Sequence, residues 1–315
     1  MFVYLLKRLI NAGLILLGLS FLVYLLMFLA PADPAQVIAS QRLGQPAKSD
    51  DIAQVRAAFG LDQPIVMQYL RWLGQTLQGD FGYSIRTDKL IRAELSSRVG
   101  WSLLLGSVAM GLVLLVGTTA GIWAALRPKS VLDQAVRLVG LVGVSIPDFW
   151  LAFVLILIFA VYLGWLPSFG AKSGWHLILP VVTLAVGQAA RLSQITRSIL
   201  GDVLRQDYLR TAQAKGLSQA TRLFRHALPN IAVPYVTVVA YQFSALISGT
   251  IIIETVFSWP GLGSYYIEAV NFRDLPVIQA SVLVFGAIIV VSNLLADLTY
   301  GLFDPRLRLN DASNR

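Results

Sequence analysis

The sequence predicts an all-α, polytopic membrane protein with six transmembrane helices. Hydrophobic residues make up 56% of the chain and charged residues only 13%, about half the charged share of a typical soluble domain. A helix needs roughly 20 apolar residues to cross a bilayer, and long uncharged runs of that size recur along the chain. The chain contains no cysteine, which excludes disulfides and thiol redox chemistry.

Six segments qualify as spans. Those without any charged residue are Leu9–Ala30, Ser102–Leu126, Ile231–Ile253 and Leu275–Ala296. A further uncharged run, Phe149–Leu166, becomes long enough when it extends backwards through Asp148 to about Leu138. The remaining span, Leu177–Thr196, is interrupted only by Arg191 near one end.

The first span resembles a secretory signal in its flanks only. Lys7 and Arg8 precede it, and Ala30-Pro31-Ala32 follows it. Its apolar core is longer than that of a cleaved signal, which has about 7–15 residues. We therefore expect a retained transmembrane helix.

Basic residues indicate the topology. With the N-terminus inside, most Lys and Arg residues fall on the cytoplasmic side, whereas the two short outer loops carry only Lys172 and Arg273. Charge in the long segment 31–100 influences topology little. The net charge of +8 is therefore typical of a protein in a lipid bilayer with both termini in the cytoplasm, and does not indicate nucleic-acid binding.

The segment 31–100 is expected to form a small extracytoplasmic helical cap, because it has too few apolar residues for a core of its own. Ser49 can cap a short helix that Gly60 ends. Pro64 then opens a second helical pattern. The chain thus divides into residues 1–30, the segment 31–100 and a five-helix core, 101–315.

The third span contains a proline and a carboxylate in Ser145-Ile146-Pro147-Asp148. A charge near mid-bilayer costs about 2.5–3.5 kcal/mol on insertion scales. Asp148 can therefore line a pathway, pair with Arg191 or cap the backbone near Pro147, and the sequence leaves these alternatives open.

The second span contains the small-residue motif Gly117-Thr118-Thr119-Ala120-Gly121. Such a motif lets two helices approach closely. We interpret it as packing within this chain rather than as contact with a partner subunit.

The cytoplasmic loop 197–230 contains a predicted amphipathic helix. Its apolar positions are Leu200, Val203, Leu204 and Tyr208. Gly216 suits the left-handed end of a helix, Ser218 can cap the next short helix, and Pro229 closes the loop where the fifth span begins. Amphipathicity alone favours a helix that rests on anionic headgroups over a docking surface.

The spacing in this loop resembles that of importer permeases of the ATP-binding-cassette (ABC) superfamily. Their pattern is Glu-Ala-Ala, three residues, Gly, nine residues, a hydrophobic residue, any residue and Leu-Pro. Here Arg210-Thr211-Ala212 occupies the triplet, Gly216 the glycine, and His226-Ala227-Leu228-Pro229 the end. The departures at Arg210, Thr211 and His226 match the dipeptide, oligopeptide and nickel branch, whose loops read like Tyr-x-Arg-Thr-Ala-x-Ala-Lys-Gly-Leu.

The resemblance covers nearly the whole chain. The motifs that look like the same branch are Tyr4-Leu5-Leu6-Lys7-Arg8-Leu9, Ala30-Pro31-Ala32-Asp33-Pro34, Gly60-Leu61-Asp62-Gln63-Pro64, Gln68-Tyr69, Gly79-Asp80-Phe81-Gly82-Tyr83-Ser84, Glu254-Thr255-Val256-Phe257-Ser258-Trp259-Pro260-Gly261-Leu262-Gly263 and Asp304-Pro305-Arg306-Leu307-Arg308. Their order and spacing together are specific. They imply the type I ABC importer permease fold.

The resemblance also implies partners in a bacterial inner membrane: a second permease subunit, two ATP-binding subunits that hold ATP and Mg, and an extracytoplasmic solute-binding protein. The chain itself has no Gly-x-x-x-x-Gly-Lys-Ser/Thr motif, so we expect it to be non-catalytic and to hold no cofactor. The residues implied in coupling to an ATP-binding subunit are Arg210, Thr211, Ala212, Ala214, Lys215, Gly216 and Leu217, and those that end the loop are His226, Leu228 and Pro229.

Two further sites are candidates. Pro147 and Asp148 are candidates for the translocation pathway, and Trp259-Pro260-Gly261 is a candidate docking site for the solute-binding protein. Glu254 is expected to reach the outer surface. No metal site is expected, because His176 and His226 fall on opposite sides of the membrane.

An ion-coupled secondary transporter is the main alternative. It would need a complete pathway in one chain, often with inverted repeats, and six helices without a repeat fit half a transporter better. An intramembrane protease is a weaker alternative, since neither histidine lies at the depth of Ser145 to act as its base. The substrate stays open between peptides, nickel and metal chelates, although the short outer loop Pro167–Trp175 looks closer to that of nickel-type members.

Overall fold

The computed structural model describes residues 2–29, 33–43 and 45–303. Within these ranges the chain is helical, and its only extended pairing is an isolated bridge between Tyr83 and Leu90. The prediction of an all-α protein is confirmed. The motifs Ala30-Pro31-Ala32 and Asp304-Pro305-Arg306-Leu307-Arg308 lie outside the described residues.

The helices group into two compact units. One unit comprises residues 1–6, 102–259 and 291–315, and the other comprises 7–101 and 260–290. The helices that contribute residues to both units are α1 (Phe2–Leu29), α5 (Ile91–Leu126) and α13 (Leu275–Phe303). The division at residues 30 and 100 stays a prediction.

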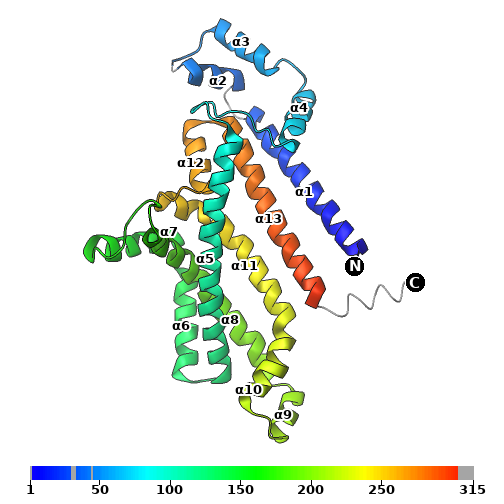
Figure 1. The fold of residues 1–315 in the computed structure, drawn as a ribbon, viewed down its shortest axis with the longest axis vertical. Coiled ribbons are helices and arrows are strands. Elements are labelled where there is room, and N and C mark those ends of the chain that lie inside the picture. The colour runs from blue at the N-terminus through cyan, green and yellow to red at the C-terminus, as the bar shows by residue number, and fades with distance from the viewer. Residues whose placement is uncertain (1, 30–32, 44, 304–315) are drawn as a thin grey trace. The chain divides into compact units, whose positions relative to one another are not determined.

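The unit that contains residues 102–259 holds the loop 197–230 (Figure 1). Its own helices are α6 (Val131–Ser145), α7 (Asp148–Leu155), α8 (Ile178–Leu204), α9 (Asp207–Ala214), α10 (Gln219–Thr221) and α11 (Leu228–Val256). A π-helical stretch, Ile156–Tyr162, continues α7, and a 3-10 turn, Gly174–Leu177, leads into α8. A second π-helical stretch, Arg222–Ala227, joins α10 to α11.

The other unit contains the short helices of the segment 31–100. They are α2 (Pro34–Leu43), α3 (Ser49–Phe59) and α4 (Ile65–Leu77), and α12 (Leu262–Phe272) belongs to the same unit. Gly60, at φ 66°, ends α3, and Pro64 precedes α4, as the sequence predicts. Ser49 does not cap α3 but is its first residue; Lys48 precedes the helix, and its backbone N–H donates to the Asp51 carboxylate at 3.1 Å.

Aromatic side chains hold α4 against α1. The Tyr69 ring lies edge-on to Phe21 and Tyr24, with centroids 5.4 and 5.7 Å apart. Its hydroxyl lies 2.8 Å from Ser20 Oγ, and the Tyr24 hydroxyl donates to Gln68 Oε1 at 3.3 Å. Aromatic pairs of this kind stabilise a contact by about 0.5–1.5 kcal/mol beyond the area that they bury. The segment 31–100 is therefore attached to the first span by side-chain packing as well as by the chain itself.

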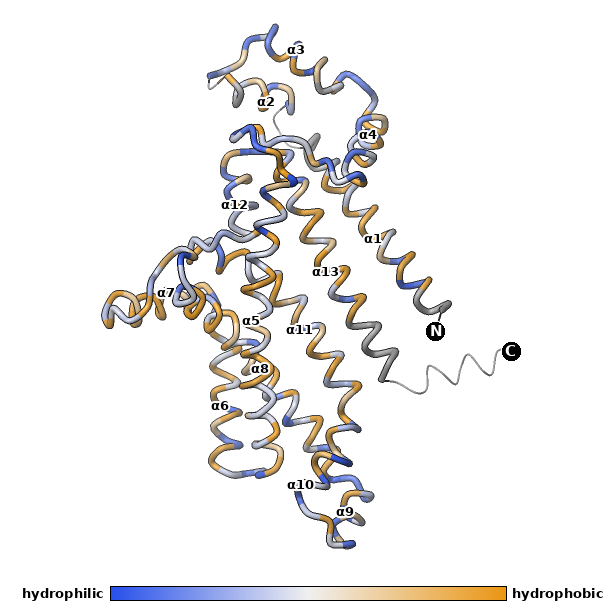
Figure 2. Tube along the Cα trace, viewed as in Figure 1, coloured by the Kyte–Doolittle hydropathy of each residue, from blue (hydrophilic) through white to orange (hydrophobic). Residues whose placement is uncertain are grey.

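The described part of the chain has five candidate spans, and the predicted number of six is reached if one bent helix pair is counted as a single span. Among the described residues, five stretches are helical, long and apolar enough to cross a membrane: Leu6–Leu25, Ile91–Leu126, Gly174–Leu204, Gln219–Val256 and Leu275–Leu295. The sixth is the pair Val131–Ser145 and Asp148–Tyr162, which is bent by 101°. Figure 2 shows that hydrophobic residues predominate along the long helices, whereas hydrophilic residues concentrate around α9 and α10.

The bend explains why the third span is not one straight helix. Proline has no backbone N–H and disfavours the helical conformation of the residue before it. Ile146 accordingly has an extended ψ of 124°, so α6 ends at Ser145 and Asp148 begins α7. Where the sequence predicts one span from Leu138 to Leu166, the structure has two helices that meet at Pro147.

Gly117 and Gly121 let α5 approach α8 closely. A Cβ at Gly117 would lie 2.9 Å from the Ala189 carbonyl oxygen, and a Cβ at Gly121 would lie 2.6 Å from the Thr196 Cβ. Both distances are too short for non-bonded heavy atoms, so the space between the helices admits only glycine here. The interpretation of this motif as packing within the chain is confirmed.

Replacing Gly121 with alanine is expected to lower the melting temperature of the detergent-solubilised protein, measured by tryptophan fluorescence. Alanine usually stabilises a helix interior by roughly 1 kcal/mol over glycine, but the overlap with Thr196 costs about 1–3 kcal/mol. Gly111 in the same helix has no heavy atom within 4 Å of an added Cβ, so Gly111→Ala is the control and should keep or raise the melting temperature. A Gly121→Ala protein that melts no lower than the wild type would contradict this packing.

Candidate functional site

The candidate coupling helix is α9, and it begins later than the amphipathic helix that the sequence predicts from Leu200 onward. The chain breaks after Leu204 because Gln206 is extended, with ψ 146°, and α9 starts at Asp207. Leu200, which the sequence assigns to the same amphipathic helix as Tyr208, instead belongs to the last turns of α8. The loop helix is therefore a separate short element that follows a long span.

The end of α9 is set by Gly216. Its φ of +80° is the left-handed conformation that glycine adopts without a steric penalty. The Gly216 N–H donates to the Gln213 carbonyl at 2.9 Å, and the Leu217 N–H donates to the Ala212 carbonyl at 3.2 Å. This pair of bonds is a Schellman motif, which satisfies the last carbonyls of a helix. The predicted left-handed stop at Gly216 is confirmed.

One face of α9 is buried and the other is exposed. Leu209 and Ala212, three residues apart, are 2% and 8% exposed. The exposed residues around them are Arg210, Thr211, Ala214, Lys215 and Gly216, and Leu217 is half-buried. The structure thus brings the predicted coupling residues together in one helix and its cap, but Ala212 faces inward.

The buried face of α9 packs into an apolar cluster formed with four other elements: α5, α8, the π-helical stretch and α11. Its fully buried members are Leu200, Leu209, Leu223, Ala227 and Ile231, and the residues packed around them include Ile122, Ala125 and Leu126 of α5. The cluster therefore joins α9 to the ends of α5, α8 and α11. Burying a leucine side chain contributes about 1.5–3 kcal/mol, so Leu209 fixes α9 firmly to these ends.

The end of the loop runs directly into the fifth span. Ser218 Oγ accepts a hydrogen bond from the Thr221 N–H at 3.2 Å, so Ser218 is a helix cap, as predicted. The helix does not stop at Pro229, which lies near the start of α11 after the π-helical stretch. A wider π-helical turn is one way to accommodate a residue that has no N–H to donate. His226 and Leu228 are half-buried, and Pro229 is exposed.

A buried ion pair ties α6 to α8 close to this loop. Asp133 is fully buried, and its carboxylate accepts hydrogen bonds from Arg197 Nε and, at 3.1 Å, from Arg197 Nη2. Arg137 Nη2 and the Lys129 N–H donate to the same carboxylate at 3.2 and 2.9 Å. The sequence analysis missed this pair. The only sequence signal is the spacing of Asp133 and Arg137, which matches an i,i+4 pair.

Asp148 is exposed at the start of α7, and its carboxylate is not paired with Arg191. Arg191 is itself exposed, and no ion pair joins the two among the described residues. Asp148 also makes no side-chain capping bond at the start of α7. Neither the ion pair with Arg191 nor the backbone cap near Pro147, which the sequence left open for Asp148, is present in the part of the chain that the structure describes.

The residues expected at the outer end of α11 lie differently from the prediction. Glu254 is fully buried and accepts a hydrogen bond from Ser102 Oγ at 2.5 Å, so it does not reach the surface. Ser258 adopts a left-handed φ of 50°, which turns Trp259 back so that its N–H donates to the Glu254 carbonyl at 2.8 Å. Trp259 is 2% exposed, Gly261 is buried and Pro260 is half-buried. Trp259 and Gly261 therefore cannot supply a docking surface directly.

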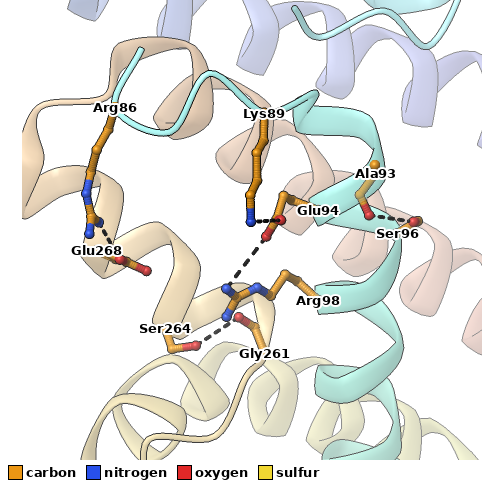
Figure 3. Close-up of polar contacts among 9 residues, drawn as sticks. All are labelled: Arg86, Lys89, Ala93, Glu94, Ser96, Arg98, Gly261, Ser264 and Glu268. Atoms are coloured by element: carbon orange, nitrogen blue, oxygen red, sulfur yellow. Dashed lines mark hydrogen bonds and ion pairs between the residues drawn. The ribbon is translucent and has the colours of Figure 1, made fainter. Parts of the chain in front are cut away.

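A charged surface lies instead on the unit with residues 7–101 and 260–290 (Figure 3). Arg86 forms an ion pair with Glu268, and Glu94 lies between Lys89 at 3.5 Å and Arg98 at 3.7 Å. The side chains of Arg86, Lys89 and Glu268 are 38%, 67% and 44% exposed. Sequence reasoning missed this surface, because its members are far apart in the chain.

Two buried residues, Asp274 and Tyr265, contact the residues of the charged surface and hold them in position. Asp274 accepts hydrogen bonds from Ser84 Oγ at 2.5 Å and from the Ile85 N–H at 3.2 Å, which fixes the loop before α5. The Arg98 guanidinium lies 5.1 Å from the centre of the Tyr265 ring, a cation–π distance. Burial raises the pKa of the Tyr265 hydroxyl to about 12, so it stays protonated at neutral pH.

No group of three or more His, Cys, Asp or Glu residues suited to a metal ion occurs in the part of the chain that the structure describes. His176 lies against Ser173, with Nδ1 3.0 Å from the Ser173 Oγ.

Comparison with known families identifies the chain. Residues 117–309 match the profile described as "Binding-protein-dependent transport system inner membrane component". The chain belongs to this family. Residues 1–89 match the N-terminal profile of the same transport-system membrane components. The chain is thus a non-catalytic permease component of an ABC importer of the peptide and nickel branch. It is a multi-pass inner-membrane protein. Membership of this family does not favour the alternatives of a secondary transporter or an intramembrane protease.

Two relatives align over nearly their full length. The glutathione transport system permease protein GsiC of Salmonella paratyphi A is 41% identical over 305 residues, which cover 97% of this chain and 98% of the relative. The oligopeptide transport system permease protein AppB of Bacillus subtilis is 36% identical over 315 residues, which cover 96% of this chain and 98% of the relative.

A solved structure shows the same fold. The inward-facing MetNI methionine ABC transporter matches with a TM-score of 0.57 and 19% identity, over 67% of this chain and 96% of that chain. The type I importer permease fold predicted from sequence is confirmed.

Replacing Asp133 with asparagine is expected to destabilise the protein by about 3–5 kcal/mol, because it leaves the Arg197 guanidinium without its buried anion. The measurement is the melting temperature of the purified chain. The matched control is Asp202→Asn, because the Asp202–Arg205 pair has side chains that are 68% and 75% exposed and such pairs stabilise little. Equal shifts for the two variants would argue against a structural role for Asp133.

Proposed function

We propose that the chain forms one half of the translocation path of a peptide importer and that α9 couples this path to an ATP-binding subunit. The single observation that carries the proposal is the two-faced character of α9. Leu209 packs α9 against the ends of three spans and Ala212 is also buried, while Arg210, Thr211 and Lys215 are exposed. The exposed face of such a helix can bind a partner subunit, and its buried face can transmit a displacement to the spans against which it packs.

The mechanism follows from the packing. Interdigitated apolar side chains resist compression, so a displacement of α9 is transmitted to α5, α8 and α11 rather than absorbed within the loop. The Schellman cap at Gly216 ends α9 with its carbonyls satisfied, which keeps the helix intact while it is pushed. Closure of an ATP-binding subunit would thus tilt the spans and open the path outward.

Family membership supports the partners in this proposal. The chain carries no phosphate-binding motif, so ATP and Mg would be held by two ATP-binding subunits. A second permease subunit would supply the other half of the path, and an extracytoplasmic solute-binding protein would deliver the solute. The distribution of Lys and Arg supports cytoplasmic placement of both termini and of α9.

Peptides are the favoured substrate class within the family. The two relatives are named for the transport of glutathione, a tripeptide, and of oligopeptides. These names favour small peptides over the nickel-type substrates that the short outer loop Pro167–Trp175 resembles.

The charged surface of Arg86, Lys89, Glu94 and Glu268 replaces Trp259 and Gly261 as the proposed docking site for the solute-binding protein. Charges of both signs at partly exposed positions suit a transient interface, because they steer encounter more than they add affinity. Pro260, which is half-buried, can still lie at the edge of such a contact.

Replacing Gly216 with valine is expected to uncouple ATP hydrolysis from uptake in reconstituted vesicles. A β-branched residue at φ +80° is strained by about 1–3 kcal/mol, so the cap opens and the end of α9 unwinds. Uptake per ATP hydrolysed should fall while the ATPase remains active. The control is Gly164→Val, since Gly164 has a similar φ of +62° and equally open surroundings but lies in another loop. Normal uptake by Gly216→Val would refute the coupling role.

Replacing Asp148 with asparagine is expected to reduce peptide uptake several-fold without lowering the melting temperature. Pro147 places this carboxylate at the break between α6 and α7, where it has no ion-pair partner among the described residues and can meet a peptide amino group. Uptake and melting temperature are measured on the same preparation, with Asp50→Asn as an exposed control in α3. Unchanged uptake with lowered stability would show instead that Asp148 is structural.

A further inference from the structure

Two adjoining cavities open beside α9, both within the residues 102–259. The first, of about 390 Å³, lies between the ends of α5 and α8 and the residues that follow α9. Its lining includes the guanidinium groups of Arg197, Arg205 and Arg222. The second, of about 440 Å³, is lined mainly by apolar residues. Leu126 and Gln219 line both cavities, so the two lie next to each other.

The arginines of the first cavity differ in how their charge is balanced. Arg197 is neutralised by buried Asp133, and Arg205 pairs with exposed Asp202. Arg222 has no carboxylate within ion-pair distance in the described ranges. Its Nη1 donates to the neutral Gln213 side chain at 2.7 Å, and its Nε is buried with no hydrogen-bond partner.

An unsatisfied charged donor in a cavity indicates a missing anion. Leaving such a donor buried without a partner is unfavourable, and a planar guanidinium fits a phosphate through paired hydrogen bonds. The carboxylates near the first cavity are already shared with other arginines. The anion therefore has to come from outside the described residues.

The second cavity suits a hydrocarbon chain. Leu132, Leu223 and two large aromatic side chains line it, and those aromatics, Trp123 and Phe224, are 63% and 68% exposed. Exposed aromatic side chains at the ends of membrane spans sit at the level of the lipid headgroups. The spans α5 and α8 end beside the two cavities, at Leu126 and Leu204.

We propose that the two cavities together bind one anionic phospholipid, with its phosphate at Arg222 and an acyl chain against Trp123 and Phe224. A free phosphate would leave the apolar cavity empty, and a lipid without a phosphate, such as diacylglycerol, would leave the buried Arg222 Nε without an anion. Because the first cavity is also lined by Leu209 of α9, the bound lipid would steady the base of the coupling helix. Only this last consequence rests on the proposed function.

The test is native mass spectrometry of the purified full-length chain with its co-purifying subunits, titrated with phosphatidylglycerol and with diacylglycerol of identical acyl chains. We expect phosphatidylglycerol to bind about tenfold more tightly, and Arg222→Gln to remove most of that preference. Arg225→Gln is the matched control, because Arg225 lies in the same π-helical stretch and is exposed but lines neither cavity. It should keep the preference.

A second variant tests the cavity without changing charge. Gly201 lines the first cavity, and the nearest heavy atom to an added Cβ is Arg205 Nη2 at 4.0 Å, so Gly201→Leu fills the space. It should abolish the preference for phosphatidylglycerol even if Arg222→Gln fails to fold.

Three results would overturn the proposal. Equal loss in Arg225→Gln would indicate diffuse electrostatic attraction. Equal binding of diacylglycerol would indicate a purely apolar groove, and full competition by glycerol phosphate would indicate a free phosphate site. If no ATP-binding subunit co-purifies with the chain but the preference for phosphatidylglycerol remains, the lipid site is supported. The missing subunit then counts against the proposed function alone.

Discussion

The apolar contact between Leu209 and the ends of three spans is the interaction on which the rest of this structure depends. An eight-residue helix is too short to be stable alone in water, so α9 exists because its buried face packs. The same cluster includes Leu200 of α8, Leu223 of the π-helical stretch and Ile231 of α11. Since α8 is also tied to α6 by Asp133 and Arg197, and to α5 at Gly117 and Gly121, α9 is connected through α8 to most of the unit that holds residues 102–259.

Features that depend on the local chain could be predicted from the sequence. The spans follow from runs of apolar residues, the stop at Gly216 from the preference of glycine for positive φ, and the cap at Ser218 from its hydroxyl. The packing role of Gly117 and Gly121 followed from their spacing on one helix face. These predictions succeed because each is decided by a few consecutive residues.

Features that depend on contacts between distant residues could not be predicted from the sequence. Asp133 and Arg197 are 64 positions apart, and nothing in either neighbourhood marks the other as its partner. The sequence shows Pro147 but not the angle of the bend, which depends on how α7 packs. Trp259 was a candidate for a docking site in an outer loop, yet the left-handed backbone of Ser258 turns it inward, where it is buried. The start of α9 was missed because the apolar period of α8 continues across the break at Gln206.

The 101° bend at Pro147 has a consequence for the parity of membrane crossings. If α6 and α7 formed a hairpin that returned to its starting side, the chain would cross an odd number of times and its termini would lie on opposite faces. If they cross as one bent segment, the number is even. Arg127, Lys129 and Arg137 precede the bend, while only Lys172 lies in the loop that follows it. A fall in the number of Lys and Arg residues is expected where the chain passes from the cytoplasmic to the outer side of the membrane. The geometry of one turn at Pro147 therefore determines on which side of the membrane the following half of the chain lies.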